Sequence, residues 1–430
     1  MLKTIANAFK IKDIRRKILI TIALLFVYRL GCHIPVPGVA IFSGLSDYSY
    51  LQIMSAVSGG ALGQGTFFAM GIGPYINASI IIQLLTVAIP RLQDLSKQGE
   101  EGRKRITAYT RICTLVLAIV QSIGIIMAFK SSINTQAIFG DTGFLRFLSY
   151  AFLVIVYTAG ACLTMWLGER ITDYGVSNGI SLLIFAGILS TAGIAIMNII
   201  GQLFNADTSA KAAWTLIGFV LVAILIFMAI VAVESGERKI PVQYAKQVKG
   251  RKMYGGQSTH IPIKVNASGV MPLIFSFAIL SLPDLILNLI GKDSSNWWSK
   301  NMGTGTIPYM IVLCVLILFF SYFYNQIQFN PDDISKSIQG NGGFIPGIRP
   351  GAPTADYLKR ISNRITLFGA IFLALVALVP SLAFSFIDAS LVNAFSATGL
   401  LIIVSVALEF DQALQSQIMM KMMGNRGFVK

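Results

Sequence analysis

The chain alternates between long charge-free stretches and short segments rich in Lys and Arg. Ten stretches read as membrane-spanning helices, because a span needs about 20 mostly apolar residues. They are residues 18–28, 48–90, 112–129, 147–168, 174–206, 212–233, 265–283, 301–331, 365–387 and 389–408. The first is short, so we expect it to extend past Arg29 to about Ile34, with the Arg29 side chain reaching the far interface.

The second stretch, 48–90, is too long for one helix. It would run about 64 Å at about 1.5 Å per residue, against a hydrocarbon core of about 30 Å. It also contains helix breakers, namely Gly59, Gly60, Gly63, Gly65, Gly71, Gly73 and Pro74. We therefore expect a re-entrant segment at about 51–66, followed by a full helix at about 74–89. A long uncharged extracellular loop is the alternative.

The sequence predicts an all-α membrane protein with ten transmembrane helices in two inverted five-helix halves. An odd number of spans per half places the second half in the opposite orientation. The predicted parts are a cytoplasmic N-terminus (1–17), a first half (18–206), a second half (207–408) and a cytoplasmic tail (409–430). Gly73-Pro74 and Gly269-x-x-Pro272 open the second span of each half, and such breakers indicate a functional site between the halves.

Charge supports this topology. The chain is 55% hydrophobic and 12% charged, with a net charge of +15. If the N-terminus is cytoplasmic, 28 of the 34 Lys and Arg residues fall in segments predicted to be inside, as the positive-inside rule requires. Both termini and the loops 234–264 and 332–364 are then cytoplasmic. The basic charge is accounted for without a nucleic-acid partner, so we expect no direct DNA binding.

Residues for catalysis, metal binding or ion coupling are scarce. The two histidines stand apart and the four cysteines lie in apolar stretches, so we expect neither a metal site nor a cofactor. No predicted span has an Asp, Glu, Lys or Arg near its centre, where ion-coupled transporters usually carry one. We therefore expect no enzyme activity. An inverted-repeat secondary transporter and a membrane-embedded hydrolase are the alternatives.

Two cytoplasmic loops carry further patterns. Residues 240–265 alternate apolar and polar positions around the basic run 249–252, which predicts a β-hairpin with a basic tip. The loop 332–364 is rich in glycine and contains Arg349. Long loops are often functional, and basic tips suit an acidic or phosphate-rich partner. A topology signal alone is the alternative.

Motifs from the first span to the last cytoplasmic loop resemble the SecY family of protein-conducting channels of the bacterial Sec translocon. They are Ile34-Pro35-Val36-Pro37-Gly38, Ser58-Gly59-Gly60-Ala61-Leu62, the run 74–85, Glu100-Glu101-Gly102-Arg103-Lys104, the run 166–172, Gly179-Ile180-Ser181, the run 257–266 and the run 344–351. The resemblance covers nearly the whole chain. It implies a central hourglass pore that opens sideways to lipid between spans two and three and spans seven and eight.

The resemblance also implies roles for particular residues. An apolar constriction ring would consist of Ile72, Ile76, Ile180, Ile184, Ile274 and Ile402. A plug would consist of Val57, Ser58, Gly59, Gly60, Ala61, Leu62, Gly63, Gln64 and Gly65. Contacts to a motor or a ribosome would involve Arg251, Lys252 and Arg349. Apart from the resemblance, our candidates for lipid-facing isoleucines outside the ring are Ile224, Ile226 and Ile230.

The implied function is that of the central pore-forming subunit of a protein translocation channel. Unfolded secretory polypeptides would pass through the pore, and transmembrane segments would leave sideways into lipid. The implied partners are the small subunits SecE and SecG, the SecA motor, the ribosome, signal peptides and nascent chains. The implied location is the bacterial plasma membrane. A ring of stiff, bulky isoleucines suits a dewetted gate, because it closes a narrow passage without specific hydrogen bonds.

Overall fold

A computed structural model describes most of the chain. The described residues are 2–42, 49–140, 142–203, 209–244, 247–249, 252–254, 258–266, 269–289, 298, 301–302, 306–387 and 397–427. The helices of the first half are α1 (Leu2–Lys10), α2 (Lys12–Gly31), α3 (Ser49–Val57), α4 (Gly73–Ala88), α5 (Pro90–Lys97), α6 (Gly99–Ala128), α7 (Gly143–Tyr174) and α8 (Gly179–Leu203). Short 3₁₀ turns, η2 (Lys130–Ser132) and η3 (Thr135–Ala137), follow α6.

The second half contains helices and a few short strands. The helices are α9 (Ser209–Glu234), α10 (Met271–Leu289), α12 (Ile307–Gln328), α13 (Pro331–Gly340), α14 (Ala352–Ile387) and α16 (Ala397–Gly427). The strands are β1 (Glu237–Tyr244), β2 (Gln247–Lys249), β3 (Lys252–Tyr254), β4 (Ser258–Lys264) and β5 (Gly343–Phe344). Each of the ten stretches predicted to span a membrane contains a described helix.

By length and hydropathy alone, four helical segments of the described chain qualify as membrane spans. They are Gly99–Ala128, Gly143–Tyr174, Ile307–Gly340 and Ala352–Val379. The pair α4 and α5 qualifies as a fifth span when taken together, although the two helices bend by 101°. Three more apolar helices in the described residues are shorter, namely Gly179–Ile194, Val220–Glu234 and Met271–Leu280.

Glycine and proline divide the long second stretch where the pattern predicted a break. Turns separate α3 from α4, and α4 begins at Gly73 with Pro74 in its first turn. Proline is well placed there because the first turn of a helix leaves its N–H groups unpaired. In the other half, α10 likewise begins just after Gly269, which has a φ of 60°. The breakers of the two halves therefore stand at equivalent helix starts.

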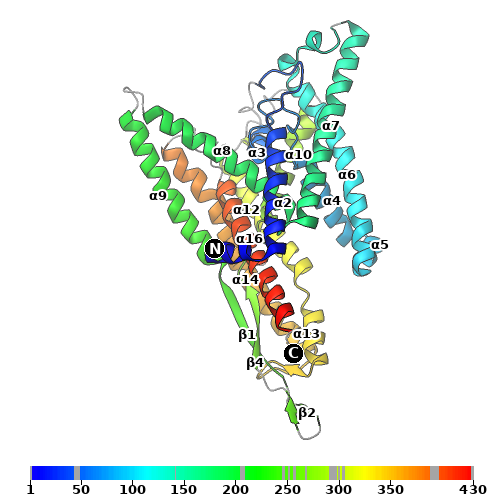
Figure 1. Ribbon diagram of the computed structural model, residues 1–430, viewed down its shortest axis with the longest axis vertical. Coiled ribbons are helices and arrows are strands. Elements are labelled where there is room, and N and C mark those ends of the chain that lie inside the picture. Colours follow the sequence, from blue (N-terminus) through cyan, green and yellow to red (C-terminus); the bar gives the residue numbers. More distant parts are fainter. Residues whose placement is uncertain are drawn as a thin grey trace.

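A small lobe of strands and helices extends from one end of the long helices (Figure 1). Strands β1 and β4 form the predicted antiparallel hairpin, β2 and β3 pair near its tip, and β5 adds to the other edge of β1. Helix α13 and the start of α14 cover this sheet, so that Val242, Ile338 and Leu358 share one buried core. The loop predicted at 332–364 is therefore largely helical. Hairpin residue Arg251 lies outside the described residues, and Lys252 begins β3.

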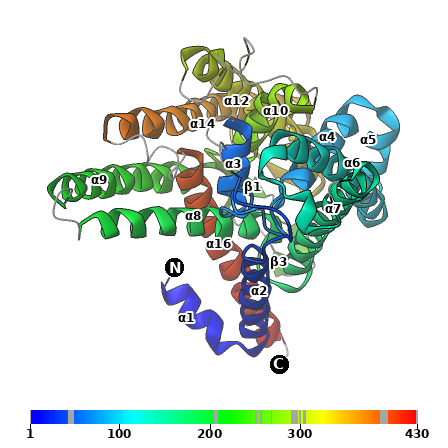
Figure 2. The same cartoon turned by 90° about the horizontal axis from the view of Figure 1, so that it is seen from above.

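The helices surround a central element. Seen from above, α3 lies between the group α10, α12 and α14 on one side and α2, α4, α7 and α8 on the other (Figure 2). One buried core belongs to the first half, a second to the later helices, and a third contains residues of both halves, including Ile72, Ile184 and Ile402. The two chain ends also meet, because α1 packs against α16 around Ala8 and Leu414.

Candidate functional site

The residues between α3 and α4, here called the turn segment (58–72), follow an irregular path that glycine makes possible. Gly59, Gly60, Gly65 and Gly71 all have φ values between 51° and 84°. Side chains other than glycine rarely adopt this left-handed region, so four such positions prevent a continuous helix. The chain therefore folds back on itself instead of crossing from α3 into α4.

Residues that follow α2 provide hydrogen-bond partners for the backbone of the turn segment. The N–H groups of Val36 and Phe42 donate to the carbonyls of Gly65 and Gly63, and the Phe67 N–H donates to the Ile34 carbonyl. Within the segment, the Leu62 N–H donates to the Ser58 hydroxyl. Irregular backbone is tolerated among membrane helices only when its polar groups are paired inside the protein. The stretch after α2 provides that pairing.

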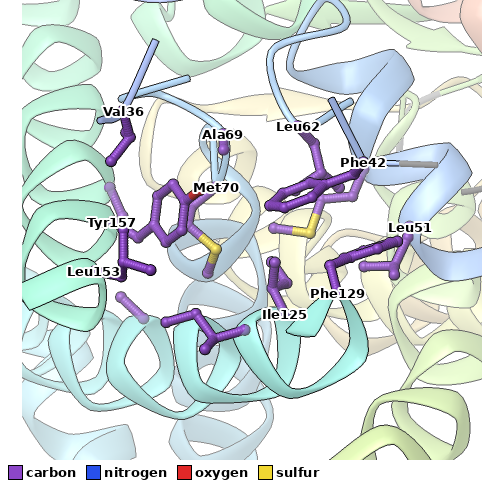
Figure 3. Packing of buried hydrophobic residues seen from close by; sticks show 14 of the residues in the cluster. Val36, Phe42, Leu51, Leu62, Ala69, Met70, Ile125, Phe129, Leu153 and Tyr157 are labelled. Carbon is purple, nitrogen blue, oxygen red and sulfur yellow. The ribbon is translucent and has the colours of Figure 1, made fainter. Parts of the chain in front are cut away.

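Side chains of α3 and the turn segment pack into the core of the first half. Leu51, Leu62 and Met70 are buried against Ile125 and Phe129 of α6 (Figure 3). This burial contradicts the alternative of a long extracellular loop. Burial of such side chains contributes roughly 1.5–3 kcal/mol each, which holds the segment among the helices.

Three helix glycines bring the turn segment unusually close. A Cβ atom placed on Gly160 of α7 would lie 2.0 Å from the Phe67 carbonyl oxygen, and one on Gly187 of α8 would lie 2.0 Å from the Val57 oxygen. A Cβ on Gly31 of α2 would lie 2.0 Å from the Phe68 ring. No side chain fits at these distances. The seat of the turn segment therefore depends on the absence of side chains on three surrounding helices.

The six isoleucines predicted to form a ring lie together. Ile72, Ile184 and Ile402 are buried members of one apolar cluster, and Ile76, Ile180 and Ile274 pack against it while partly buried. They come from the start of α4, the start of α8, the first turn of α10 and the second turn of α16. We call these six residues the isoleucine cluster.

Two cavities meet at the isoleucine cluster. One, of about 100 Å³, is lined by Ile72 together with Val57 and Ser58. The other, of about 60 Å³, is lined by Ile180 and Ile184. Three members of the cluster line both cavities, namely Ile76, Ile274 and Ile402. The cluster thus separates a space next to the turn segment from a second space, and both spaces have mostly apolar walls.

Other predicted residues are placed differently. Ile224 is exposed as expected for a lipid-facing residue, but Ile226 and Ile230 are only 5% and 0% exposed. The prediction for these two was wrong, because they occupy the face of α9 that packs into the core of the second half. The Arg29 guanidinium does not simply reach an interface either. Its Nη1 atom donates to the Gly59 carbonyl at 3.0 Å.

The sequence analysis missed the residues of α8 that contact α3. The Thr191 hydroxyl donates to the Ala56 carbonyl at 3.0 Å, one turn after Gly187. Small residues four positions apart on an apolar helix often mark a close contact, so the pair Gly187 and Thr191 carried a readable signal. The pattern could not say which backbone would lie against it.

In the lobe formed by the strands, α13 and the start of α14, the backbone around Arg349 is fixed while its side chain is exposed. The Thr354 hydroxyl donates to the Arg349 carbonyl at 2.8 Å, and the Ser335 hydroxyl donates to the Gly351 carbonyl at 2.7 Å. Both hydroxyl residues are buried. The lobe therefore presents a cation on an ordered turn, which suits recognition of an acidic surface.

Comparison with known proteins identifies the family. The SecY family model matches residues 66–410. The chain is 42% identical to a protein translocase subunit SecY of Streptomyces galbus, over 97% of this chain and 98% of that one. It is 39% identical to the corresponding subunit of Mycobacterium bovis over the full length of both. The chain belongs to the SecY family.

Solved structures agree with this assignment. A structure of a protein conducting channel matches with a TM-score of 0.68 at 20% identity, over 94% of this chain and 92% of that one. Sec61 of a canine ribosome-channel complex matches with a TM-score of 0.67 at 19% identity, over the same shares of the two chains. The predicted fold of a multi-pass SecY channel is confirmed. The chain is a subunit of a protein-conducting channel, and no finding supports the secondary transporter.

The close packing of α8 against α3 gives a first prediction. Gly187→Val places two methyl groups where the Val57 carbonyl lies, so the turn segment must shift. We expect a loss of about 1–3 kcal/mol in stability, which is typical of overpacking. Gly193→Val on the same helix is the matched control, because a Cβ there meets nothing within 4 Å. Thermal unfolding of the purified variants measures the difference. Equal melting temperatures would show that the close approach is unimportant.

Proposed function

We propose that the isoleucine cluster is the gate of a protein-translocating pore and that Val57–Gly65 is the plug that closes it. The observation that carries this proposal is the cavity shared by the two elements, since Val57 and Ser58 line the same space as Ile72, Ile76 and Ile274. An unfolded polypeptide would pass through the cluster after the plug leaves that space. The pore moves a chain without breaking or forming covalent bonds in it, so we propose no enzyme activity.

The chemistry of the cluster suits this role. Its side chains offer no hydrogen bond to a substrate, so residues of many kinds can slide past without being held. A narrow apolar constriction also dewets, and a dewetted passage resists ions although no charged group blocks it. Two polar side chains at the edges, Ser58 and Asn77, belong to the cavity lining.

The route for transmembrane segments lies between the halves. Ile80 of α4 packs with Phe275 of α10 and Phe320 of α12 in one apolar cluster. No ion pair among the described residues crosses this contact. On the side of the second half, the rings of Phe275 and Phe320 meet edge to face with their centroids 5.8 Å apart. We propose that α4 and α10 separate along this contact, so that an apolar segment exchanges protein contacts for lipid at little cost.

Replacing members of the isoleucine cluster tests the gate. The triple variant Ile76→Ser, Ile184→Ser and Ile402→Ser should wet the constriction, because polar and smaller side chains remove its apolar bulk. We expect the resting ion conductance of reconstituted channels to rise at least about tenfold, while translocation of a competent secretory substrate falls little. Planar-bilayer recordings and a vesicle import assay measure the two quantities.

Isoleucines outside the cluster provide the control for this experiment. The triple variant Ile155→Ser, Ile224→Ser and Ile311→Ser removes the same side chains from exposed helix faces. Its resting conductance should match that of the unmodified channel. A cluster variant that conducts no better than this control would mean that the constriction lies elsewhere.

The cytoplasmic lobe is the proposed docking surface for the machinery that drives translocation. Arg349 is exposed on an ordered turn, Lys252 begins β3, and Arg251 precedes Lys252 in the sequence. We propose that these residues bind the SecA motor and the ribosome, and that SecE and SecG complete the complex. A canine relative by fold, Sec61, is known in a ribosome-channel complex, which supports the ribosome as a partner.

Charge reversal tests the motor contact. Arg349→Glu should reduce motor-driven export by at least about tenfold, because a cation that meets an acidic surface becomes a repulsive anion. The abundance and melting temperature of the chain should stay unchanged, since this side chain is exposed. Lys359→Glu, an exposed residue at the start of α14, is the matched control. Equal export by the two variants would mean that Arg349 only contributes to the positive charge that orients the chain in the membrane.

We propose that the chain lies in the bacterial plasma membrane with both termini in the cytoplasm. The support is the positive-inside distribution of Lys and Arg together with the contact between α1 and α16, which brings the two ends to one side.

Reporter fusions test this orientation. A fusion after Asn341, in the cytoplasmic lobe, should report the cytoplasm, and one after Ser132, in the turn after α6, should report the outside. The reason is that inside segments carry most of the Lys and Arg residues. Alkaline phosphatase and fluorescent-protein fusions measure the two sides in a complementary way. The reverse pattern would invert the proposed orientation.

A further inference from the structure

Arg29 stands where the turn segment, α2 and α8 meet. It lies in the last turn of α2, and its Nη1 atom donates to the Gly59 carbonyl at 3.0 Å. The side chain is only half buried. A hydrogen bond from a cation is roughly twice as strong as one between neutral groups. The contact therefore joins the end of α2 to the beginning of the proposed plug.

The geometry around Gly59 is fitted to this arginine. A Cβ atom on Gly59 would lie 2.5 Å from Arg29 Nη1, which would push the guanidinium away. The same atom would lie 3.2 Å from the Cα and carbonyl oxygen of Gly187. Gly60 has a similar backbone, with a φ of 84° against 69°, but a Cβ there meets nothing within 4 Å. Only the first of the two neighbouring glycines makes room for the arginine.

The end of α3 adds an electrostatic attraction to this contact. A helix ends with unpaired carbonyl groups and a partial negative charge. Thr191 of α8 donates to one of these carbonyls, on Ala56, and Arg29 donates to the next chain turn at Gly59. The half-buried cation thus lies beside the negative end of α3, close to the point where Gly187 of α8 approaches Gly59. Both contacts end when α3 and the turn segment move away together.

We propose that Arg29 is a latch that holds the plug in its closed position through the Gly59 carbonyl. This inference rests on the proposed function, in which Val57–Gly65 closes the pore. Because Arg29 is half exposed, water replaces the lost carbonyl when the plug leaves, so the latch favours the closed state without making it permanent.

Accessibility of a buried plug residue measures the latch directly. Ser58 is 1% exposed. In a chain whose four native cysteines are replaced by Ala, Ser58→Cys gives a single thiol of similar size that a membrane-impermeant maleimide reaches only when the plug moves. In this background, Arg29→Met should raise the labelling rate about tenfold and also raise the resting conductance of the full channel. Arg29→Lys keeps a cationic donor and should restore part of the protection. Lys130→Met, an exposed cation at the same end of the helices, should change neither quantity.

The two glycines test the same contact from the other side. Gly59→Ala should raise the labelling rate as Arg29→Met does, and the double variant should gain little more, because both changes break one contact. Gly60→Ala carries the same backbone strain but leaves Arg29 in place, so its effect should be smaller. These variants keep the test sharp even if Arg29→Met lowers the yield of folded channel.

The outcomes separate the latch from the proposed function. Unchanged labelling and conductance in folded Arg29→Met channels, with a leaky isoleucine-cluster variant, would overturn the latch and leave the gate standing. Equal effects of Gly59→Ala and Gly60→Ala would also overturn it, because backbone strain alone would then explain the release. Faster labelling of Arg29→Met without any rise in conductance would support the latch and overturn the sealing role of the plug.

Discussion

The need to pair every backbone polar group in an apolar interior governs this structure. The turn segment (58–72) is irregular chain among long helices, where an unpaired N–H or C=O costs several kcal/mol. Residues 34–42, the Ser58 hydroxyl and the Arg29 side chain supply partners for it, and Thr191 pairs the Ala56 carbonyl at the end of α3. The same groups that make the segment tolerable also fix its position, so in the proposed function closure of the pore depends on the same contacts as local folding.

Close packing adds to this constraint. Hydrogen bonds of this kind need the backbones to approach, and Gly160 and Gly187 allow contacts that any side chain would block. The position of the turn segment is therefore well defined, although few contacts hold it. The segment is held by surface complementarity and a few hydrogen bonds instead of a deep covalent or ionic anchor. In the function proposed above, an entering polypeptide displaces it without unfolding the helices around it, and the isoleucine cluster, built on four separate helices, stays in place.

Much of the fold was predictable because bilayer physics leaves few options. Charge-free stretches had to be helices, and the length of the stretch 48–90 together with its glycines required a break. The alternation in 240–265 was enough to predict the hairpin of β1 and β4. The six isoleucines were predicted from the resemblance to the SecY family and not from periodicity. Hydropathy does not distinguish an isoleucine that faces lipid from one that packs against protein. The errors at Ile226 and Ile230 have that origin.

The contacts of single polar residues were beyond the sequence pattern for a different reason. Arg29 ends an apolar stretch, and such an arginine ordinarily extends to water, so hydropathy predicts the same side chain whether or not a carbonyl lies nearby. Its partner is the backbone carbonyl of Gly59. Every residue has such a carbonyl, so the sequence does not indicate which one accepts the bond. The close approach of the arginine does leave a trace in the sequence, because it requires glycine at position 59. Of the two adjacent glycines, only Gly59 faces the guanidinium. For this contact, the small residue that makes room for the polar side chain is therefore a better sequence signal than the polar residue itself.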